Sequence, residues 1–190
     1  MDLCRISKSL FYCNIQYPLI CRLQALLRLT TVTNTIELAY TCSKHFAGYP
    51  CCHRQWRHSG HCRFVHGYSR SFTFWFAAKQ LDCYGFVVDF SSLRPLEQQL
   101  REQFDHTFLA NSDDPLLPQW QELHYQGAID LRVMKNVGME SSAELVWQWA
   151  NALLFDRDAG RTCCWRVEAR ENEANAACFE AKPEWFQAAT

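Results

Sequence analysis

The stretch SRSFTFWFA, at residues Ser69–Ala77, alternates polar and aromatic side chains along the chain. Its three phenylalanines fall on one face of an extended chain, and the residues between them fall on the other face. This period of two predicts a β-strand with one buried face. The stretch TIELAYT at Thr35–Thr41 alternates in the same way and predicts a second strand, and Gly85–Phe90 predicts a short third strand in an antiparallel hairpin.

Two amphipathic helices are predicted among these strands. The first carries an apolar stripe over Leu93–Phe104 at spacings of three and four residues. The second begins at the capping box Ser141–Glu144 and has an apolar residue every four positions over Leu145–Leu153. Further strands are predicted at about residues 128–134, 164–170 and 176–179. Four main strands with two one-sided helices predict an α+β sandwich, not a doubly wound parallel sheet.

The composition excludes several classes of protein. With 190 residues, of which 48% are hydrophobic, the chain can bury one sizeable core. A formal net charge of -1 provides no general attraction to nucleic acid, and the sequence has no apolar run long enough to span a membrane. Eleven cysteines, an odd number with adjacent pairs such as Cys51 and Cys52, favour free thiols in a reducing cytoplasm.

The first 32 residues differ from the rest of the chain. Asp2 is their only acid, and basic residues interrupt an apolar sequence rich in leucine and cysteine. We interpret residues 1–32 as an extension outside the fold, although an acid-poor targeting segment has the same composition. Residues 33–182 are predicted to form the domain, and residues 183–190 a tail.

Five of the seven histidines lie in one cysteine-containing segment, at His45, His53, His58, His61 and His66. Imidazole and thiolate are the side chains that zinc prefers, and a catalytic zinc has three protein ligands and one open position. The spacings match no structural zinc finger. The segment therefore favours a catalytic zinc site over a closed structural one.

The segment HCRFVHGYSRSF, His61–Phe72, resembles the C-x3-H-G-H-S-Y region of the 6-pyruvoyl-tetrahydropterin synthase and 6-carboxytetrahydropterin synthase family. Four further motifs follow in the order of the family. Gly85–Phe90 resembles its G-x-V-x-D-F strand, Phe104–Asn111 its L-D-H-x-x-L-N with one extra residue before the asparagine, Ser141–Glu144 its P-T-A-E helix start, and Val167–Glu171 its last strand. The resemblance covers about residues 35–180.

This resemblance implies the tunnelling fold, a four-stranded antiparallel sheet with two helices on one face. Such chains assemble into homo-oligomeric barrels with active sites between subunits. The resemblance also implies a lyase that acts on 7,8-dihydroneopterin triphosphate. The motifs favour the branch that makes 6-carboxytetrahydropterin, releases triphosphate and acetaldehyde, and leads to the queuosine precursors. The alternative branch makes 6-pyruvoyl-tetrahydropterin.

The resemblance implies that zinc is held by His45 and His66, with His61 as the third ligand, because Tyr68 stands where the family has a second glycine-linked histidine. A neutral phenol is a poor ligand unless the metal drives its deprotonation. Cys52-His53-Arg54 also resembles the A-H-R ligand motif of the family, so His53 is an alternative to His45 or to His61.

Other roles follow from the same resemblance. Cys62 would be the catalytic base, and the pair Asp105–His106 would relay protons, since a carboxylate-oriented imidazole transfers protons near neutral pH. Glu171 would accept hydrogen bonds from the pterin, and Ser142 would contact the substrate. Each has an ordinary interpretation as well: an inert thiol, a charge pair at a helix end, an exposed carboxylate and a helix cap.

The segment between the two histidine motifs is basic and aromatic. Arg54, Arg57 and Arg63 either clamp the triphosphate, since guanidinium groups match phosphate oxygens, or form a solvated loop. With Trp56 and Phe64 between them, they also raise a competing function, a zinc-supported nucleic-acid-binding module. The lack of net positive charge makes nucleic acid an unlikely partner.

Overall fold

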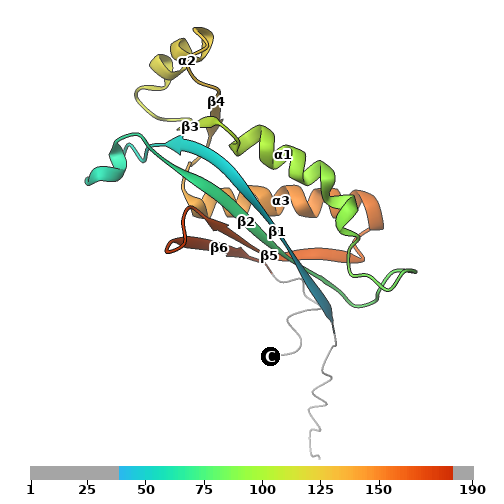
Figure 1. Cartoon of the computed structure of the whole chain (residues 1–190). Coiled ribbons are helices and arrows are strands. Elements are labelled where there is room, and N and C mark those ends of the chain that lie inside the picture. Colours follow the sequence, from blue (N-terminus) through green and yellow to red (C-terminus); the bar gives the residue numbers. More distant parts are fainter. Residues whose placement is uncertain (1–38, 182–190) are drawn as a thin grey trace, which may run out of the picture. The chain divides into compact units, whose positions relative to one another are not determined.

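The computed structural model describes residues 39–181, which form a curved sheet with helices packed on it (Figure 1). The strands are β1 Tyr40–His53, β2 His66–Ala78, β3 Thr107–Asn111, β4 Leu131–Met134, β5 Thr162–Arg170 and β6 Ala176–Glu180. The helices are α1 Arg94–Phe104, α2 Leu117–Tyr125 and α3 Met139–Asp158, with short 3-10 turns at His61–Arg63 and Phe90–Leu93. The predicted extension at 1–32, most of the predicted strand Thr35–Thr41 and the tail at 183–190 lie outside the described residues.

The sheet is mixed, with the strand order β4-β3-β1-β2-β5-β6. The block β1-β2-β5-β6 is antiparallel throughout, as predicted, but β3 and β4 extend it in parallel beside β1. The prediction of a four-stranded, purely antiparallel sheet with two helices is therefore wrong in strand count and direction, while the α+β class is confirmed. All five residues of β3 are buried, so this strand lacks the alternation by which the others were found.

Two local predictions also need correction. Gly85–Phe90 is a loop and not a strand, because the Asp82 carboxylate accepts the backbone N–H groups of Tyr84 and Phe86 and holds a turn there. In α3 the buried residues are Ser142, Ala143, Val146, Ala150 and Leu154, one position away from the predicted stripe. The helix α2 was not predicted and buries none of its residues.

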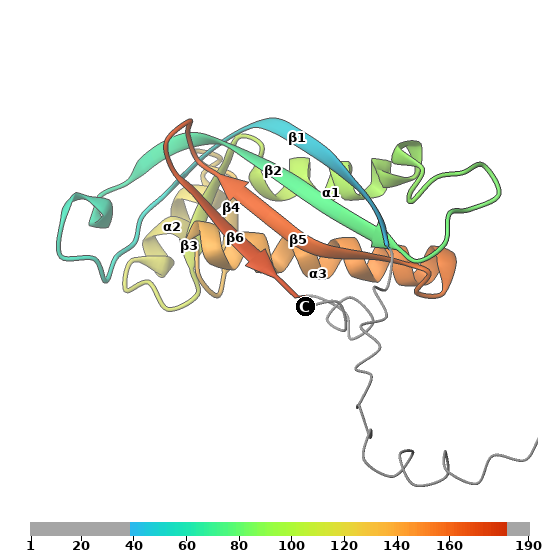
Figure 2. The same cartoon turned by 90° about the horizontal axis from the view of Figure 1, so that it is seen from below.

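The core lies between the sheet and the helices α1 and α3, which cover one face (Figure 2). Phe72, Phe74 and Phe76 of β2 are fully buried there, as the alternation predicted. The Phe72 ring lies 4.9 Å from the ring of Phe104 in α1. Burial of each such side chain contributes about 1.5–3 kcal/mol, so this face fixes where the helices sit.

A β-bulge in β1 changes which residues face the core. The pairing with β2 shifts between Ala47 and Tyr49, and the intervening Gly48 has φ +87°, a conformation that glycine adopts without strain. Phe46 is buried before the bulge, and Tyr49, Cys51 and His53 are buried after it. The buried positions therefore change from even to odd residue numbers at Gly48.

Within residues 39–181, none of the helices is long and apolar enough to span a bilayer.

Candidate active site

The ends of β1 and β2 bring two histidines together. His53 and His66 are paired across the two strands, and their ring centroids lie 4.5 Å apart. Nδ1 of His66 lies 2.7 Å from the carbonyl oxygen of Phe64 and donates to it, so that in the neutral form of the ring Nε2 carries the lone pair. His53 is 5% exposed, and its Nδ1 has no hydrogen-bond partner within the described residues.

The electrostatics keep the His53 imidazole neutral. Burial, followed by the nearby charges of Arg70 and His66, lowers the pKa of His53 to about 3. A neutral imidazole is the form that binds metals. An orphaned buried nitrogen beside a second imidazole already oriented by a backbone carbonyl fits a metal ion. The zinc implied by the sequence therefore suits His53 and His66.

A cavity of about 480 Å³ opens beside this pair. It lies between the β1–β2 loop, the start of α3 and the turn that joins β5 to β6. Its lining includes the predicted residues His61, Cys62, His66 and Glu171, together with Gln55, Tyr68, Met139, Glu140 and Asn175. Asn175 Nδ2 donates to Glu171 Oε1 at 3.0 Å. Four predicted site residues thus share one cavity.

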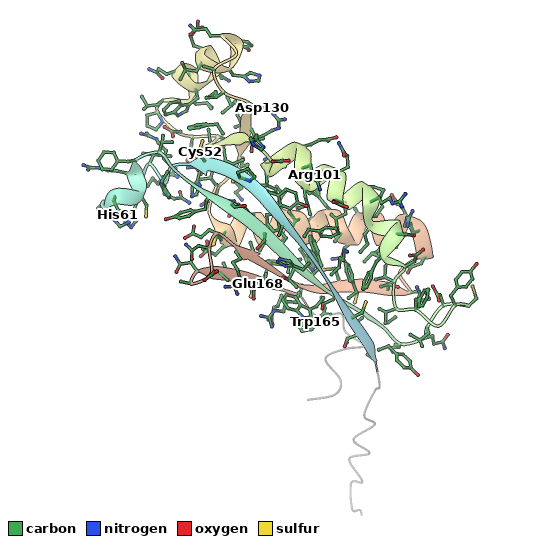
Figure 3. All side chains as sticks on the ribbon, viewed as in Figure 1. Cys52, His61, Arg101, Asp130, Trp165 and Glu168 are labelled. Carbon is green, nitrogen blue, oxygen red and sulfur yellow. The ribbon has the colours of Figure 1, made fainter. Side chains whose placement is uncertain are left out.

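His61 and Cys62 belong to the 3-10 turn in the β1–β2 loop, and Figure 3 shows His61 on that loop, beyond the end of the strands. Both side chains line the cavity. Among residues 39–181, however, no three His, Cys, Asp or Glu side chains lie close enough together to hold a metal ion. His61 is thus near the histidine pair without completing a trio.

His45 lies elsewhere on β1. It is paired with Thr73, and its Nδ1 is 2.9 Å from the Thr73 hydroxyl, on an exposed part of the sheet. Thr73 lies seven positions after His66, which is roughly 23 Å along a strand. His45 and His66 of one chain therefore do not share an ion, so the predicted pairing is wrong, whereas His53, the alternative to His45, lies beside His66. The Cys52-His53-Arg54 motif was the signal for this pair.

The predicted proton relay lies in a different cavity. Asp105 Oδ1 is 2.6 Å from Nδ1 of His106, whose side chain is 84% exposed and whose backbone has φ +58°. The backbone N–H of His106 donates to Pro50 at 2.7 Å. His106 lines a cavity of about 620 Å³ together with Cys52, while Cys62 lines the first cavity. The structure therefore does not bring Asp105 and His106 beside Cys62 of the same chain.

Ser142 is fully buried, so its predicted contact with substrate is not supported. Its hydroxyl accepts a hydrogen bond from Arg70 Nη1 at 2.6 Å and donates to the Gly138 carbonyl at 2.9 Å. Ser142 thus joins the start of α3 to Arg70 of β2. Its role is to hold these two elements together.

Comparison with known proteins decides the family. The sequence profile described as 6-pyruvoyl tetrahydropterin synthase matches residues 41–182 of the chain. The chain belongs to this family. A 68-residue stretch is 32% identical to the 6-carboxy-5,6,7,8-tetrahydropterin synthase of Rickettsia conorii and covers 35% of this chain and 49% of that protein. This match spans about half the length of the curated relative.

Solved structures share the fold. An uncharacterized protein from Wolinella succinogenes matches with a TM-score of 0.61 and 22% identity, over 76% of this chain and 99% of that one. A 6-pyruvoyltetrahydropterin synthase from Plasmodium vivax matches with a TM-score of 0.55 and 14% identity over the same shares. At these identities the likeness concerns the fold alone.

The arginines after His53 have carboxylate partners in this tetrahydropterin synthase family member. Arg54 binds Asp114 through two hydrogen bonds of 2.8 and 2.9 Å, and Arg57 forms an ion pair with Asp113. Burial is the largest single influence on Asp114 and opposes its ionisation, but the hydrogen bonds from Arg54 and the Leu116 N–H, together with the charge of Arg54, outweigh it, so the pKa of this carboxyl is lowered. The predicted triphosphate clamp is thus not supported for Arg54 and Arg57, because both are already paired.

Sequence reasoning missed the residue that ties the site together. Asn111 is buried, and its side chain accepts from the Val137 N–H at 3.0 Å and donates to the Arg54 carbonyl at 3.3 Å. It thereby joins the residue after His53 to the loop that enters α3. Its signal was the asparagine of the L-D-H-x-x-L-N motif, to which no role was given.

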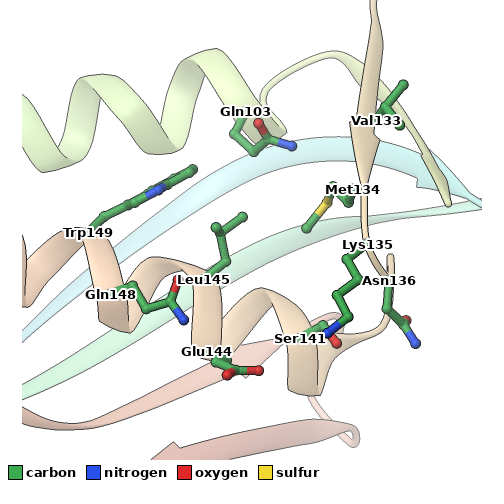
Figure 4. A pocket seen from close by; sticks show the side chains of 10 residues that line it. All are labelled: Gln103, Val133, Met134, Lys135, Asn136, Ser141, Glu144, Leu145, Gln148 and Trp149. Atoms are coloured by element: carbon green, nitrogen blue, oxygen red, sulfur yellow. The ribbon is translucent and has the colours of Figure 1, made fainter. Parts of the chain in front are cut away.

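A third cavity, of about 410 Å³, lies between α1, β4 and α3 (Figure 4). The amide side chains of Gln103, Asn136 and Gln148 line it beside Trp149. None of the predicted catalytic or metal-binding residues is among its lining residues. The first cavity is therefore the candidate active site.

Proposed function

We propose that this protein is a zinc-dependent synthase that converts 7,8-dihydroneopterin triphosphate to 6-carboxytetrahydropterin and releases triphosphate and acetaldehyde. The observation that carries the proposal is the convergence of His53, His66, Cys62 and Glu171 on one cavity. Membership of the pterin synthase family supports the substrate class. The name of the Rickettsia conorii relative favours the carboxy product over 6-pyruvoyl-tetrahydropterin, the alternative product.

His53 and His66 are the residues that would hold the zinc. When bound there, zinc supplies a Lewis acid that polarises a hydroxyl of the substrate side chain. The protein contributes a neutral, buried His53 and a His66 ring fixed by the Phe64 carbonyl. Because both rings are oriented before binding, little reorganisation opposes metal capture.

Cys62 is the base of the proposed reaction. Its side chain faces the cavity that contains the histidine pair, and as a thiolate it removes a proton from the substrate carbon next to the polarised hydroxyl. Glu171, which lines the cavity from the turn between β5 and β6, accepts hydrogen bonds from the N–H groups of the aminopyrimidine edge. The cavity thus holds the ring at one end and reacts with the side chain at the other.

The pair Asp105–His106 enters this scheme from a second copy of the chain. The exposed His106 ring is available to a neighbouring molecule, and within its own chain it lies in another cavity. In a homo-oligomer with active sites between subunits, the oriented imidazole relays protons to the Cys62 site of its neighbour. This assignment explains why a proton-relay pair lies away from the thiol.

Product analysis tests the proposal. The purified, zinc-loaded full chain is incubated with dihydroneopterin triphosphate, and triphosphate, acetaldehyde and the pterin product are measured. Triphosphate and acetaldehyde in equal amounts are expected. Triphosphate without acetaldehyde selects the pyruvoyl product, and neither compound rejects both reactions.

A further inference from the structure

The strand β2 departs from the family motif at two positions on one face. The chain has H-G-Y-S-R at His66–Arg70 where the motif reads H-G-H-S-Y, so Tyr68 replaces a histidine and Arg70 replaces a tyrosine. Alternate residues of a strand point to the same side, and Arg70 is followed on this side by the buried Phe72. The two departures are therefore neighbours in space.

Tyr68 belongs to the histidine pair by position. Its ring centroid lies 5.8 Å from that of His66, and it lines the same cavity as His53 and His66. The side chain is 38% exposed, so the phenol oxygen is not confined to the core. Tyr68 thus lies beside the histidine pair, at the position where the family motif has its second histidine.

Arg70 lies deeper on the same face and is 1% exposed. Its hydrogen bonds go to neutral groups, from Nη1 to the Ser142 hydroxyl at 2.6 Å and from Nη2 to the Val137 carbonyl at 2.7 Å. Nε has no partner within the described residues. Glu171 acts on the Arg70 guanidinium through its charge, without a hydrogen bond to it, so a further anion close to this buried cation would be stabilised.

We propose that Tyr68 is the third protein ligand of the metal, bound through its phenolate oxygen, and that Arg70 is a positioning residue whose fixed charge favours this anionic donor. The assignment rests on the proposed metal at His53 and His66. On binding, the phenolic proton passes to solvent as the metal–oxygen bond forms, one proton for each metal ion. A phenolate with an arginine has the same net charge as a histidine with a tyrosine, so the two replacements compensate each other.

The other side chains of the cavity are less suited to this place. His61, Cys62, Glu140 and Glu171 also line it, yet among the described residues no trio of His, Cys, Asp or Glu side chains can hold an ion. Tyr68 lies on the same strand and face as His66, whereas His61 and Cys62 lie on the loop. A rigid strand places a ligand more accurately than a loop does.

Metal affinity and a spectroscopic signature test the assignment. Zinc affinity is measured by competition with a chromophoric chelator, and the copper(II)-loaded protein is examined for the visible charge-transfer band of a copper-bound phenolate. The wild-type chain is expected to bind one zinc and to show the band. Tyr68→Phe is expected to lose the band and to bind zinc at least about tenfold more weakly. Tyr68→His is expected to lose the band but to keep zinc.

His61→Ala and Cys62→Ala are the matched controls, and both are expected to keep the zinc and the band. The Cys62 variant also excludes a thiolate as the source of the band. Arg70→Met is expected to weaken zinc binding in the wild type but not in the Tyr68→His background. If Arg70→Met does not fold, Arg70→Lys is expected to bind zinc like the wild type because it keeps the charge.

Two outcomes separate this assignment from the proposed function. If the wild-type chain binds no zinc, the zinc-dependent function fails and the ligand assignment fails with it. If the wild type binds zinc and Tyr68→Phe binds it equally well, only the assignment of Tyr68 is overturned.

Discussion

In both halves of β2, alternate side chains point to the same side of the sheet, but the two halves serve different purposes. In the second half, Phe72, Phe74 and Phe76 point into the core, and any well-packed apolar residue would serve there. In the first half, His66, Tyr68 and Arg70 point to the same side but are polar, and one of them is a buried cation. The site is thus an extension of the core face, and it gains its rigidity from the aromatic half of the same strand.

The largest expected effect is a loss of turnover without a loss of stability, in the Cys62 variant. Cys62→Ala should lower turnover by about 10²–10⁴-fold, because the proposed base is removed, while zinc content and the free energy of unfolding stay close to wild type. Steady-state rates, metal analysis and urea unfolding measure the three quantities. Cys83→Ala, in the exposed loop after β2, is the control. Loss of zinc in the Cys62 variant would place this residue among the ligands instead.

In the aromatic half of β2, by contrast, a substitution should change the stability of the fold. Phe74→Ala should lower the free energy of unfolding by about 3–5 kcal/mol, since it leaves a cavity under α1 and α3. Ser71→Ala, on the other face, should change it by no more than about 0.5 kcal/mol. Urea unfolding of both variants tests the difference, and equal effects would contradict the one-sided burial.

The buried His53 should make the free energy of unfolding depend on pH. The pKa of His53 is about 3 in the folded chain and close to 6.5 in the unfolded chain, so between these values the unfolded chain binds more protons. The free energy of unfolding of the metal-free protein should therefore fall, by up to a few kcal/mol, as the pH decreases from 6.5 towards 3. His53→Gln should flatten this dependence and His45→Gln should not. Equal slopes in the two variants would reject the assignment.

The smallest effects are expected in the loop next to the site. Asp114→Asn breaks a buried pair and should cost about 1–3 kcal/mol at neutral pH. Asp113→Asn breaks an exposed pair and should lower the free energy of unfolding by less than Asp114→Asn does. The pKa of Asp114 is lowered on folding, so its contribution is present above the unfolded value and is lost as the pH falls through the folded one. Thermal unfolding at several pH values measures both variants.

The core could be predicted from the sequence because one face of β2 and one stripe of α1 are apolar at regular spacing. The parallel strand β3 could not, since all its residues are buried and no alternation marks it. The choice of His45 over His53 has a related cause. The first strand was predicted to end at Thr41, shortly before His45, whereas β1 continues to His53. The bulge at Gly48 breaks the alternation that would have revealed this length.

Contacts between residues far apart in the sequence were also difficult to predict. Cys62, His66 and Glu171, which the motifs grouped together, line one cavity, but the motifs also grouped Asp105 and His106 with them, and His106 lines another cavity. Motif order carries no information on which copy of a chain supplies a residue. The ion pairs of Arg54 and Arg57 with Asp114 and Asp113 were equally invisible, because the partners are more than fifty residues away.

The bulge at Gly48 also decides which residues of β1 face inward beyond it. Before it, even-numbered residues face inward, and after it, odd-numbered residues do, so His53 enters the site and its neighbour Cys52 does not. If β1 ran through Gly48 without the bulge, even-numbered residues would stay inward, and Cys52 would take the inward position of His53 without any substitution in the site itself. The residues of β1 that reach the cavity thus depend partly on a single-residue bulge that lies outside the cavity.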